Sequence, residues 1–388
     1  MINKQISIPY KDKQLNGSMI MINNSNNESI NLPYILFIPE NINEESELIV
    51  SCSTPATSKA GYDETISSIE SNMYVDNNVK ELINELNYPV LFPIIPRFPG
   101  FYSTFLSSKV RNNDTSELEQ WIDAGYSKLE KENMEKLKNI DSQVYAMIEE
   151  SKKVLENYTN IDDRVIMSGY SAGAHFANGF TALHPEIVDM EICGGQAGLQ
   201  IQPLSELKEE KLNYPLGFND IGNDKLEQYK QVSHFFYMGS EDVNNPAQID
   251  EESNERKAHF SACYTDEEVC KIDKVFNGIN QQDRFEVNQM IYDNLGIDAT
   301  YKKYAGNHQT VQINDEVSKD VVNWVKTKTK KQELTQEKPK VKTLSQNPNG
   351  FTDAILLSLI TGFAGGIITT IMINIIIWNI IIIFFYVK

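Results

Sequence analysis

The sequence predicts an α/β fold in which helices cover both faces of a mostly parallel sheet. Short apolar segments of strand type recur up to residue 304, and segments with helical spacing separate several of them. One strand-type segment also runs into a helix-type segment through a serine flanked by glycines, at residues 169–173. The 388 residues, 41% of them hydrophobic, suffice for one large domain of this class.

The expected elements alternate along the chain. An Asn-rich turn at 23–27 predicts a hairpin connection between two of the early strands. Helical spacing is found at 64–86 and at 118–158. We expect about eight strands, at residues 5–10, 17–22, 34–39, 48–52, 90–95, 164–168, 232–238 and 299–304.

Charge and cysteine content exclude some functions. The formal net charge is −19, which argues against a nucleic-acid partner because such a partner needs a basic surface. The four cysteines show no metal-binding spacing, so no metal is expected. Cys263 and Cys270 are close enough in sequence to pair in an oxidising compartment. Free thiols are expected instead, because residues 1–7 lack the apolar stretch of a secretory signal.

Residues 354–387 are predicted to form a transmembrane segment. They contain no charged residue and are rich in Ile, Leu and Phe. A straight helix of this length would be ~51 Å long, against a hydrocarbon core of ~30 Å. A single tilted span is preferred, and a hairpin that breaks at Gly365 and Gly366 is the alternative.

The Lys-rich stretch before this segment is predicted to be a flexible linker, residues 327–353. Several lysines precede the apolar run, whereas Lys388 alone follows it. The positive-inside rule therefore places the large domain, residues 1–326, in the cytoplasm. The chain is accordingly expected to have a membrane as one of its partners.

The sequence GYSAG at 169–173 predicts an exposed nucleophile. A strand, a tight turn and a helix force Ser171 into a sharp elbow at the carboxyl edge of the sheet. A serine hydroxyl needs a general base, and that base needs an orienting acid. Asp242 and His308 each follow a strand-type segment, so both should reach the same edge, with Glu241 as the alternative acid.

His308 is selected from the five histidines by its position in the chain. His175 lies one helical turn beyond the serine and is expected to pack or hydrogen-bond there. His184 precedes a proline at a helix end, where it is expected to cap the helix. His234 lies within a strand, and His259 lies in a polar insert.

The oxyanion hole is expected to use two backbone N–H groups. The first belongs to Ala172, the residue after the nucleophile. The second should come from the loop after strand 48–52, where Pro55 has no N–H to donate, so Thr54 is the candidate.

These motifs resemble the α/β-hydrolase superfamily, and especially the esterase branch with polyhydroxybutyrate-depolymerase-like and feruloyl-esterase-like proteins. The residues that carry the resemblance are GYSAG at 169–173, GSED at 239–242, LGIDAT at 295–300 and YAGNH at 304–308, in the order nucleophile, acid, histidine. The resemblance covers residues 30–326. It implies an α/β-hydrolase fold of eight strands and a serine-hydrolase mechanism without metal or organic cofactor.

The expected function is hydrolysis of a carboxylic ester through an acyl-enzyme. Residues 201–231 and 244–294 are inserts that often form a cap over the pocket in such positions, and their aromatic side chains either line an acyl site or form the core of the insert. A non-catalytic binding module of the same fold is the alternative. A peptidase or thioesterase would use the same residues. The substrate and the oligomeric state are left open.

Overall fold

The computed structural model describes residues 2–23, 27–52, 76–95, 136–243, 264–276 and 280–336, with isolated helical positions at 63, 65–67, 69, 119 and 123. The chain divides into two units, Met1–Lys330 and Lys331–Lys388. The first unit contains every strand that the structure describes, and the account below concerns it.

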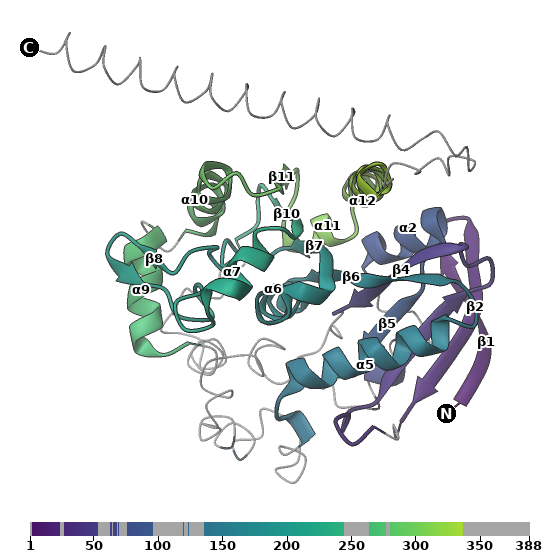
Figure 1. Ribbon diagram of the computed structural model, residues 1–388. Coiled ribbons are helices and arrows are strands. Elements are labelled where there is room, and N and C mark those ends of the chain that lie inside the picture. Colours follow the sequence, from purple (N-terminus) through teal and green to yellow (C-terminus); the bar gives the residue numbers. More distant parts are fainter. Residues whose placement is uncertain are drawn as a thin grey trace, which may run out of the picture. The chain divides into compact units, whose positions relative to one another are not determined.

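Nine strands form one sheet in the order β1-β2-β3-β5-β4-β6-β7-β10-β11. The first pairings, from β1 to β5, are antiparallel, and all pairings from β5 to β11 are parallel. The predicted α/β fold with a mostly parallel sheet is therefore confirmed (Figure 1). The strands are β1 (Ile2–Tyr10), β2 (Lys13–Ile22), β3 (Tyr34–Pro39), β4 (Glu45–Ser51), β5 (Val90–Pro93), β6 (Asn160–Tyr170), β7 (Val188–Gly194), β10 (Ser233–Gly239) and β11 (Ala299–Tyr304).

The ninth strand, β7, was missing from the eight that the sequence predicts. It lies between β6 and β10 and is buried along its whole length. Two acidic residues, Asp189 and Glu191, interrupt its apolar pattern. Both are buried with a partner from another element, since Asp189 pairs with Arg164 and Glu191 bonds to His234.

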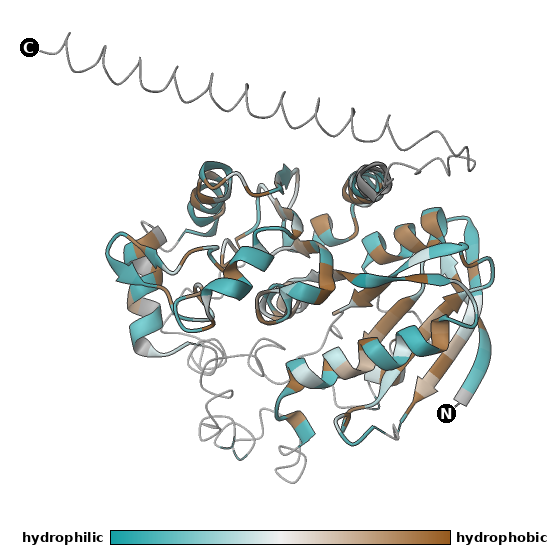
Figure 2. Cartoon of the chain, viewed as in Figure 1, coloured by the Kyte–Doolittle hydropathy of each residue, from teal (hydrophilic) through white to brown (hydrophobic). Residues whose placement is uncertain are grey.

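The sheet buries apolar side chains on both faces. Along β3, Leu36 packs into a cluster with Val144 of α5 (Ile140–Leu155) and Phe176 of α6 (Ala172–Leu183). Its neighbour Phe37 packs into a second cluster with helices α2 (Asn77–Leu86) and α12 (Asp315–Gln336). This alternation follows from the two-residue period of a strand. Figure 2 shows the resulting hydrophobic strands beneath helices with hydrophilic outer faces.

Eight helices of four residues or more cover the described part of the sheet and its inserts. The predicted helix at 118–158 is represented by α5, which begins only after Asn139, a residue with a left-handed φ of 49°. The helices are α2 (Asn77–Leu86), α5 (Ile140–Leu155), α6 (Ala172–Leu183), α7 (Asn223–Tyr229), α9 (Asp266–Phe276), α10 (Gln281–Asn294), α11 (His308–Gln312) and α12 (Asp315–Gln336). A short 3-10 turn, η3 (Pro185–Ile187), precedes β7.

The described parts of the two predicted inserts contain short helices and a hairpin. The first holds α7 and a hairpin of β8 (Glu206–Leu207) and β9 (Glu210–Lys211), and the second holds α9 and α10. Phe285 and Tyr292 of α10 are 2% and 0% exposed and belong to the main core cluster. These two aromatic side chains therefore form core rather than line an acyl site.

The helix α12 differs from the predicted domain boundary. It continues to Gln336, through the first ten positions of the segment predicted as a linker, 327–353. Lys328 forms an ion pair with Asp298, and Thr329 donates a hydrogen bond to Glu47. The sequence of alternating Lys and Thr is polar, but lysine is a good helix former, and a helix already begun on the core extends through it.

Within the described residues, none of the helices has the length and apolar character that crossing a bilayer requires. The predicted transmembrane segment, 354–387, lies outside those residues, and so does the rest of the predicted linker from 337 to 353.

Candidate active site

Ser171 occupies a strained turn between β6 and α6. Its φ of 55° and ψ of −119° place it in a region that non-glycine residues rarely adopt. Its main-chain N–H donates to Gly194 O at 2.8 Å, which ties the turn to the end of β7. The side chain is partly exposed, as a nucleophile at the carboxyl edge of the sheet requires.

Both glycines of the motif are required by close backbone approaches. A Cβ on Gly169 would overlap the carbonyl group of Gly173, across the turn. A Cβ on Gly173 would overlap the carbonyl oxygen of Cys52, the last described residue after β4. The turn is therefore packed directly against the start of the loop that contains Thr54. Thr54 itself lies outside the described residues.

Ala172 is the first residue of α6 and is fully buried. The N–H groups in the first turn of a helix have no acceptor within the helix, and they lie at the positive end of its dipole. This N–H is therefore suited to binding a developing negative charge beside the Ser171 hydroxyl.

Asp242 and His308 are brought together by the two strands at the end of the sheet. His308 Nδ1 lies 2.8 Å from Asp242 Oδ2, and the aspartate is buried whereas 12% of the histidine side chain is exposed. A carboxylate accepts, so Nδ1–H is the donor and Nε2 is left as the basic nitrogen. Glu241, the alternative acid, is exposed.

Insert helix α10 holds the turn that carries Asp242. The side-chain amide of Gln281 donates to Asp242 O at 2.5 Å, and that of Gln282 donates to Gly239 O at 2.9 Å. These two residues were not predicted from the sequence. Their position at the start of an insert helix gave no sign that they reach back to the main chain of the acid turn.

The Gly194–Gly195 segment lies between the serine turn and the histidine. Gly194 accepts from Ser171 N, and a Cβ on Gly195 would lie 2.8 Å from His308 Cε1. The adjacent Gly195 has a φ of 65°, which favours glycine. Ser171, Asp242 and His308 thus follow the ends of three parallel strands, β6, β10 and β11.

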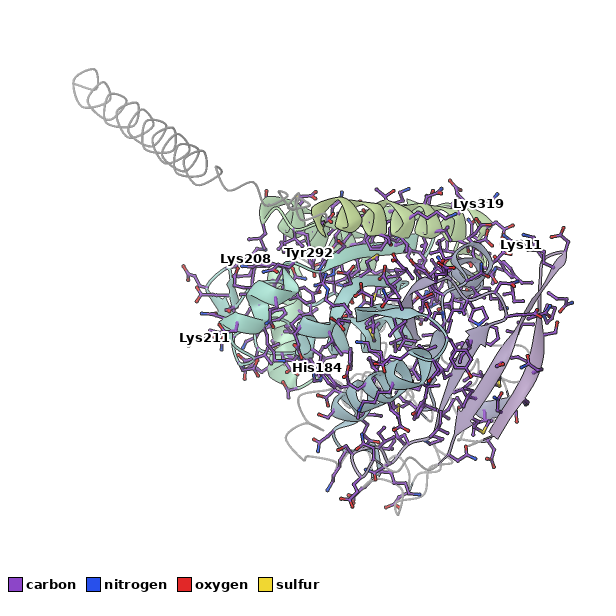
Figure 3. The ribbon with its side chains drawn as sticks, turned by 45° about the vertical axis from the view of Figure 1, so that its right-hand side comes forward. Lys11, His184, Lys208, Lys211, Tyr292 and Lys319 are labelled. Atoms are coloured by element: carbon purple, nitrogen blue, oxygen red, sulfur yellow. The ribbon has the colours of Figure 1, made fainter. Side chains whose placement is uncertain are left out.

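Two other histidines, His184 and His234, have partners elsewhere. His184 Nε2 lies 3.1 Å from Asp141, beyond the end of α6 (Figure 3). His234 is fully buried, with Nδ1 2.7 Å from Glu191. His259 lies outside the described residues.

His175 lies on the first turns of α6 beside the site. Burial, followed by the positive charges of Arg284 and His308, lowers its pKa to about 4. It is therefore a neutral imidazole at pH 7. Arg284 itself is fully buried and donates to Ala197 O through Nε at 3.0 Å.

The described residues contain no group of three or more His, Cys, Asp or Glu side chains arranged to hold a metal ion. Cys52 and Cys193 are buried free thiols, Cys270 is an exposed free thiol, and Cys263 is not among the described residues. A polar hollow of about 560 Å³ lies between α5 and the beginning of β6, at the strand end opposite Ser171. It is therefore separate from the candidate site.

Comparison with known proteins finds no matching family model and no matching curated protein. Similar solved structures include poly(aspartic acid) hydrolase-1 from Sphingomonas sp. KT-1, with 14% identity, a TM-score of 0.47, and coverage of 75% of this chain and 93% of that one. LpqC, a poly(3-hydroxybutyrate) depolymerase from Bordetella parapertussis, has 12% identity, a TM-score of 0.44 and coverage of 84% and 91%. A ferulic acid esterase has 11% identity, a TM-score of 0.43 and coverage of 81% and 98%. These similarities concern the fold alone.

Proposed function

We propose that this chain is a serine hydrolase that cleaves carboxylic esters. The observation that carries the proposal is the bond between His308 Nδ1 and the buried Asp242 carboxylate, at the same sheet edge as Ser171. A buried carboxylate on Nδ1 fixes the tautomer of the imidazole and stabilises the imidazolium that forms during acyl transfer. A serine in a strained turn at the same sheet edge as such a histidine is suited to nucleophilic attack.

In the proposed mechanism, Ser171 Oγ attacks the ester carbonyl carbon while His308 Nε2 accepts the hydroxyl proton. The N–H groups of Ala172 and Thr54 stabilise the oxyanion of the tetrahedral intermediate. His308 then returns the proton to the leaving alcohol, and an acyl-enzyme remains on Ser171. Water, deprotonated by His308, then attacks the acyl carbon, and His308 returns this proton to Ser171 Oγ as the ester bond to the serine breaks and the acid is released.

Fluorophosphonate labelling tests the nucleophile. The full-length protein in detergent should be labelled covalently, and Ser171→Ala should not be labelled. Ser233→Ala is a matched control, because Ser233 lies at the start of β10, at the end opposite the Asp242 turn, and its hydroxyl donates to Asp298. Absence of labelling in the wild type, or equal labelling of Ser171→Ala, contradicts the proposal.

A substrate panel separates the hydrolase classes that share this machinery. The proposal expects turnover of p-nitrophenyl esters of graded acyl length, with kcat/KM higher than for matched thioesters and peptides. If a peptide or a thioester is the preferred substrate, the protein is a peptidase or a thioesterase rather than an esterase. Absence of both labelling and turnover of all of these substrates would favour a binding module.

We also propose that residues 354–387 anchor the domain to a membrane, with the domain on the cytoplasmic side. The uncharged run of 34 residues and the lysines that precede it support this proposal. The full chain should remain in the membrane fraction after carbonate extraction, and a chain ending at residue 353 should not. Protease added to intact cells should spare the domain, and digestion from outside would reverse the orientation.

A further inference from the structure

Tyr170, the residue immediately before the serine, contacts the histidine. Its hydroxyl donates a hydrogen bond to His308 O at 2.5 Å, and the two ring centroids are 5.0 Å apart. Tyr170 is the last residue of β6 and is 3% exposed. One side chain therefore joins the nucleophile turn to the turn that carries the base, although 137 residues separate Ser171 from His308 in the chain.

The histidine turn is bonded to the acid turn through Glu241 N–H and Gly306 O, and its helix α11 is bonded to Asp76 through Gln312, whereas Tyr170 bonds it to the serine turn. Asn307 and Thr310 form a capping box that shapes the start of α11. His308 Nδ1 is held by Asp242 at one point of the ring. The bond from Tyr170 to His308 O holds the main chain of the same residue from the serine side.

Packing around the two rings restricts the histidine further. A Cβ on Gly195 would lie 2.8 Å from both His308 Cε1 and Tyr170 Cζ, so glycine, tyrosine and histidine are in close contact. Burial and the nearby charges of Asp242 and Asp76 raise the pKa of Tyr170 well above its usual value. The hydroxyl therefore keeps its proton and remains a donor across the working pH range.

We propose that Tyr170 is a positioning residue that sets the place of His308 relative to Ser171. This inference rests on the proposed hydrolase function. In this proposal Tyr170 acts through the main chain of His308 rather than on the substrate, because its side chain is buried and its hydroxyl bonds to His308 O. A displacement of about 1 Å in a reacting group lowers the rate by roughly 10²-fold, so loss of the hydroxyl should act on kcat and leave KM unchanged.

The test compares Tyr170→Phe with Tyr237→Phe in the full-length protein. Tyr237 is a matched control, because it is 1% exposed, lies with its ring centroid 5.9 Å from that of Tyr170, and accepts a hydrogen bond from Asn78 at 2.7 Å. Each variant loses one buried hydroxyl group and one hydrogen bond, to His308 O in Tyr170→Phe and from Asn78 in Tyr237→Phe. We expect kcat to fall about 10- to 100-fold in Tyr170→Phe, and less than twofold in Tyr237→Phe, with similar losses of thermal stability.

A second readout does not depend on activity. The proton shared between His308 Nδ1 and Asp242 gives a downfield ¹H NMR resonance when the imidazole is held firmly. This resonance should broaden or vanish in Tyr170→Phe and persist in Tyr237→Phe. If Tyr170→Phe does not fold, Tyr170→Met repeats both measurements with a flexible apolar side chain of similar length.

The outcomes separate the two proposals. Fluorophosphonate labelling of wild type with unchanged kcat and an unchanged resonance in Tyr170→Phe overturns the positioning role and leaves the hydrolase proposal intact. Equal losses of kcat in both tyrosine variants also overturn it, because they show a general packing effect. No labelling or turnover in wild type refutes the hydrolase function, and the resonance then still decides whether Tyr170 holds His308.

Discussion

Replacing Asp76 by Asn should stabilise the protein at neutral and alkaline pH. Asp76 precedes α2 and is buried, and its Oδ1 accepts from Gln312 Nε2 at 2.9 Å. Burial is the largest cause that raises its pKa from 3.8 to about 6, against opposing effects of the Gln312 bond and the Lys80 charge. Gln312 belongs to α11, the helix that starts with His308, so this carboxyl is hydrogen-bonded to the helix that carries the proposed base.

The magnitude follows from the linkage between protonation and folding. A folded pKa near 6 and an unfolded pKa near 3.8 differ by about 2 pH units, which corresponds to about 3 kcal/mol at roughly 1.4 kcal/mol per unit. The folded state binds the extra proton, so the cost of ionising Asp76 is absent below pH 4, grows as the pH rises, and is complete above about pH 6. Asn removes this cost, but it also removes the partner charge of Lys80. We therefore expect a gain of about 1 to 2 kcal/mol at pH 8.

Urea unfolding of the full-length protein in detergent, followed by circular dichroism between pH 4 and pH 8, measures this effect. The difference in free energy of unfolding between Asp76→Asn and wild type should rise from near zero at pH 4 to its full value by pH 7. Asp224→Asn, at an exposed position in the first turn of α7, is the control and should show no comparable rise. A difference that stays constant over this pH range would refute a raised pKa for Asp76.

Three further outcomes are expected. Asp242→Asn should lower kcat by about 10³- to 10⁴-fold with the fold retained, since it removes the charge that stabilises the imidazolium; stopped-assay kinetics with circular dichroism check this, and a loss below tenfold would contradict the role of Asp242. Gly173→Ala should destabilise by at least about 2 kcal/mol or prevent folding, because its Cβ overlaps Cys52 O; a normal melting temperature would contradict the packing of this turn. Glu47→Gln should be more stable than wild type by up to about 3 kcal/mol at pH 8.5, and equal to it near pH 4.5. The reason is that burial raises the Glu47 pKa from 4.5 to about 7, whereas Gln carries no charge and still accepts the hydrogen bond from Thr329. Urea titrations at both pH values decide this.

The parts that were predictable from the sequence are those fixed by local pattern and topology. The serine turn is encoded within a few residues, by a strand, two glycines and a helix start. Asp242 and His308 were assigned to one edge because parallel strands all end at the same edge of a sheet. The order of the chain therefore predicted that these two side chains would meet, and the structure brings them within hydrogen-bond distance.

The parts that were not predictable depend on distant partners. The strand β7 was missed because Asp189 and Glu191 break its apolar pattern, and each becomes tolerable only through Arg164 or His234 from a neighbouring strand. The end of α12 was assigned to a linker because the sequence shows polar residues there. Its contact between Thr329 and Glu47 links positions 282 residues apart and has no local signal.

Chain order alone selected His308 as the proposed base, and the surroundings of His175 and His308 supply the physical reason for that choice. His175 is nearer in sequence, yet it lies within α6, where burial and the charges of Arg284 and His308 hold its pKa near 4. Protonating it as a base would oppose all three effects. His308 instead has a buried carboxylate on Nδ1, so the positive charge that a base acquires is stabilised there. The same sheet edge therefore holds one buried imidazole that is kept neutral and one that bonds to a buried carboxylate, and this difference is made by residues on other strands and helices rather than by the motif around Ser171.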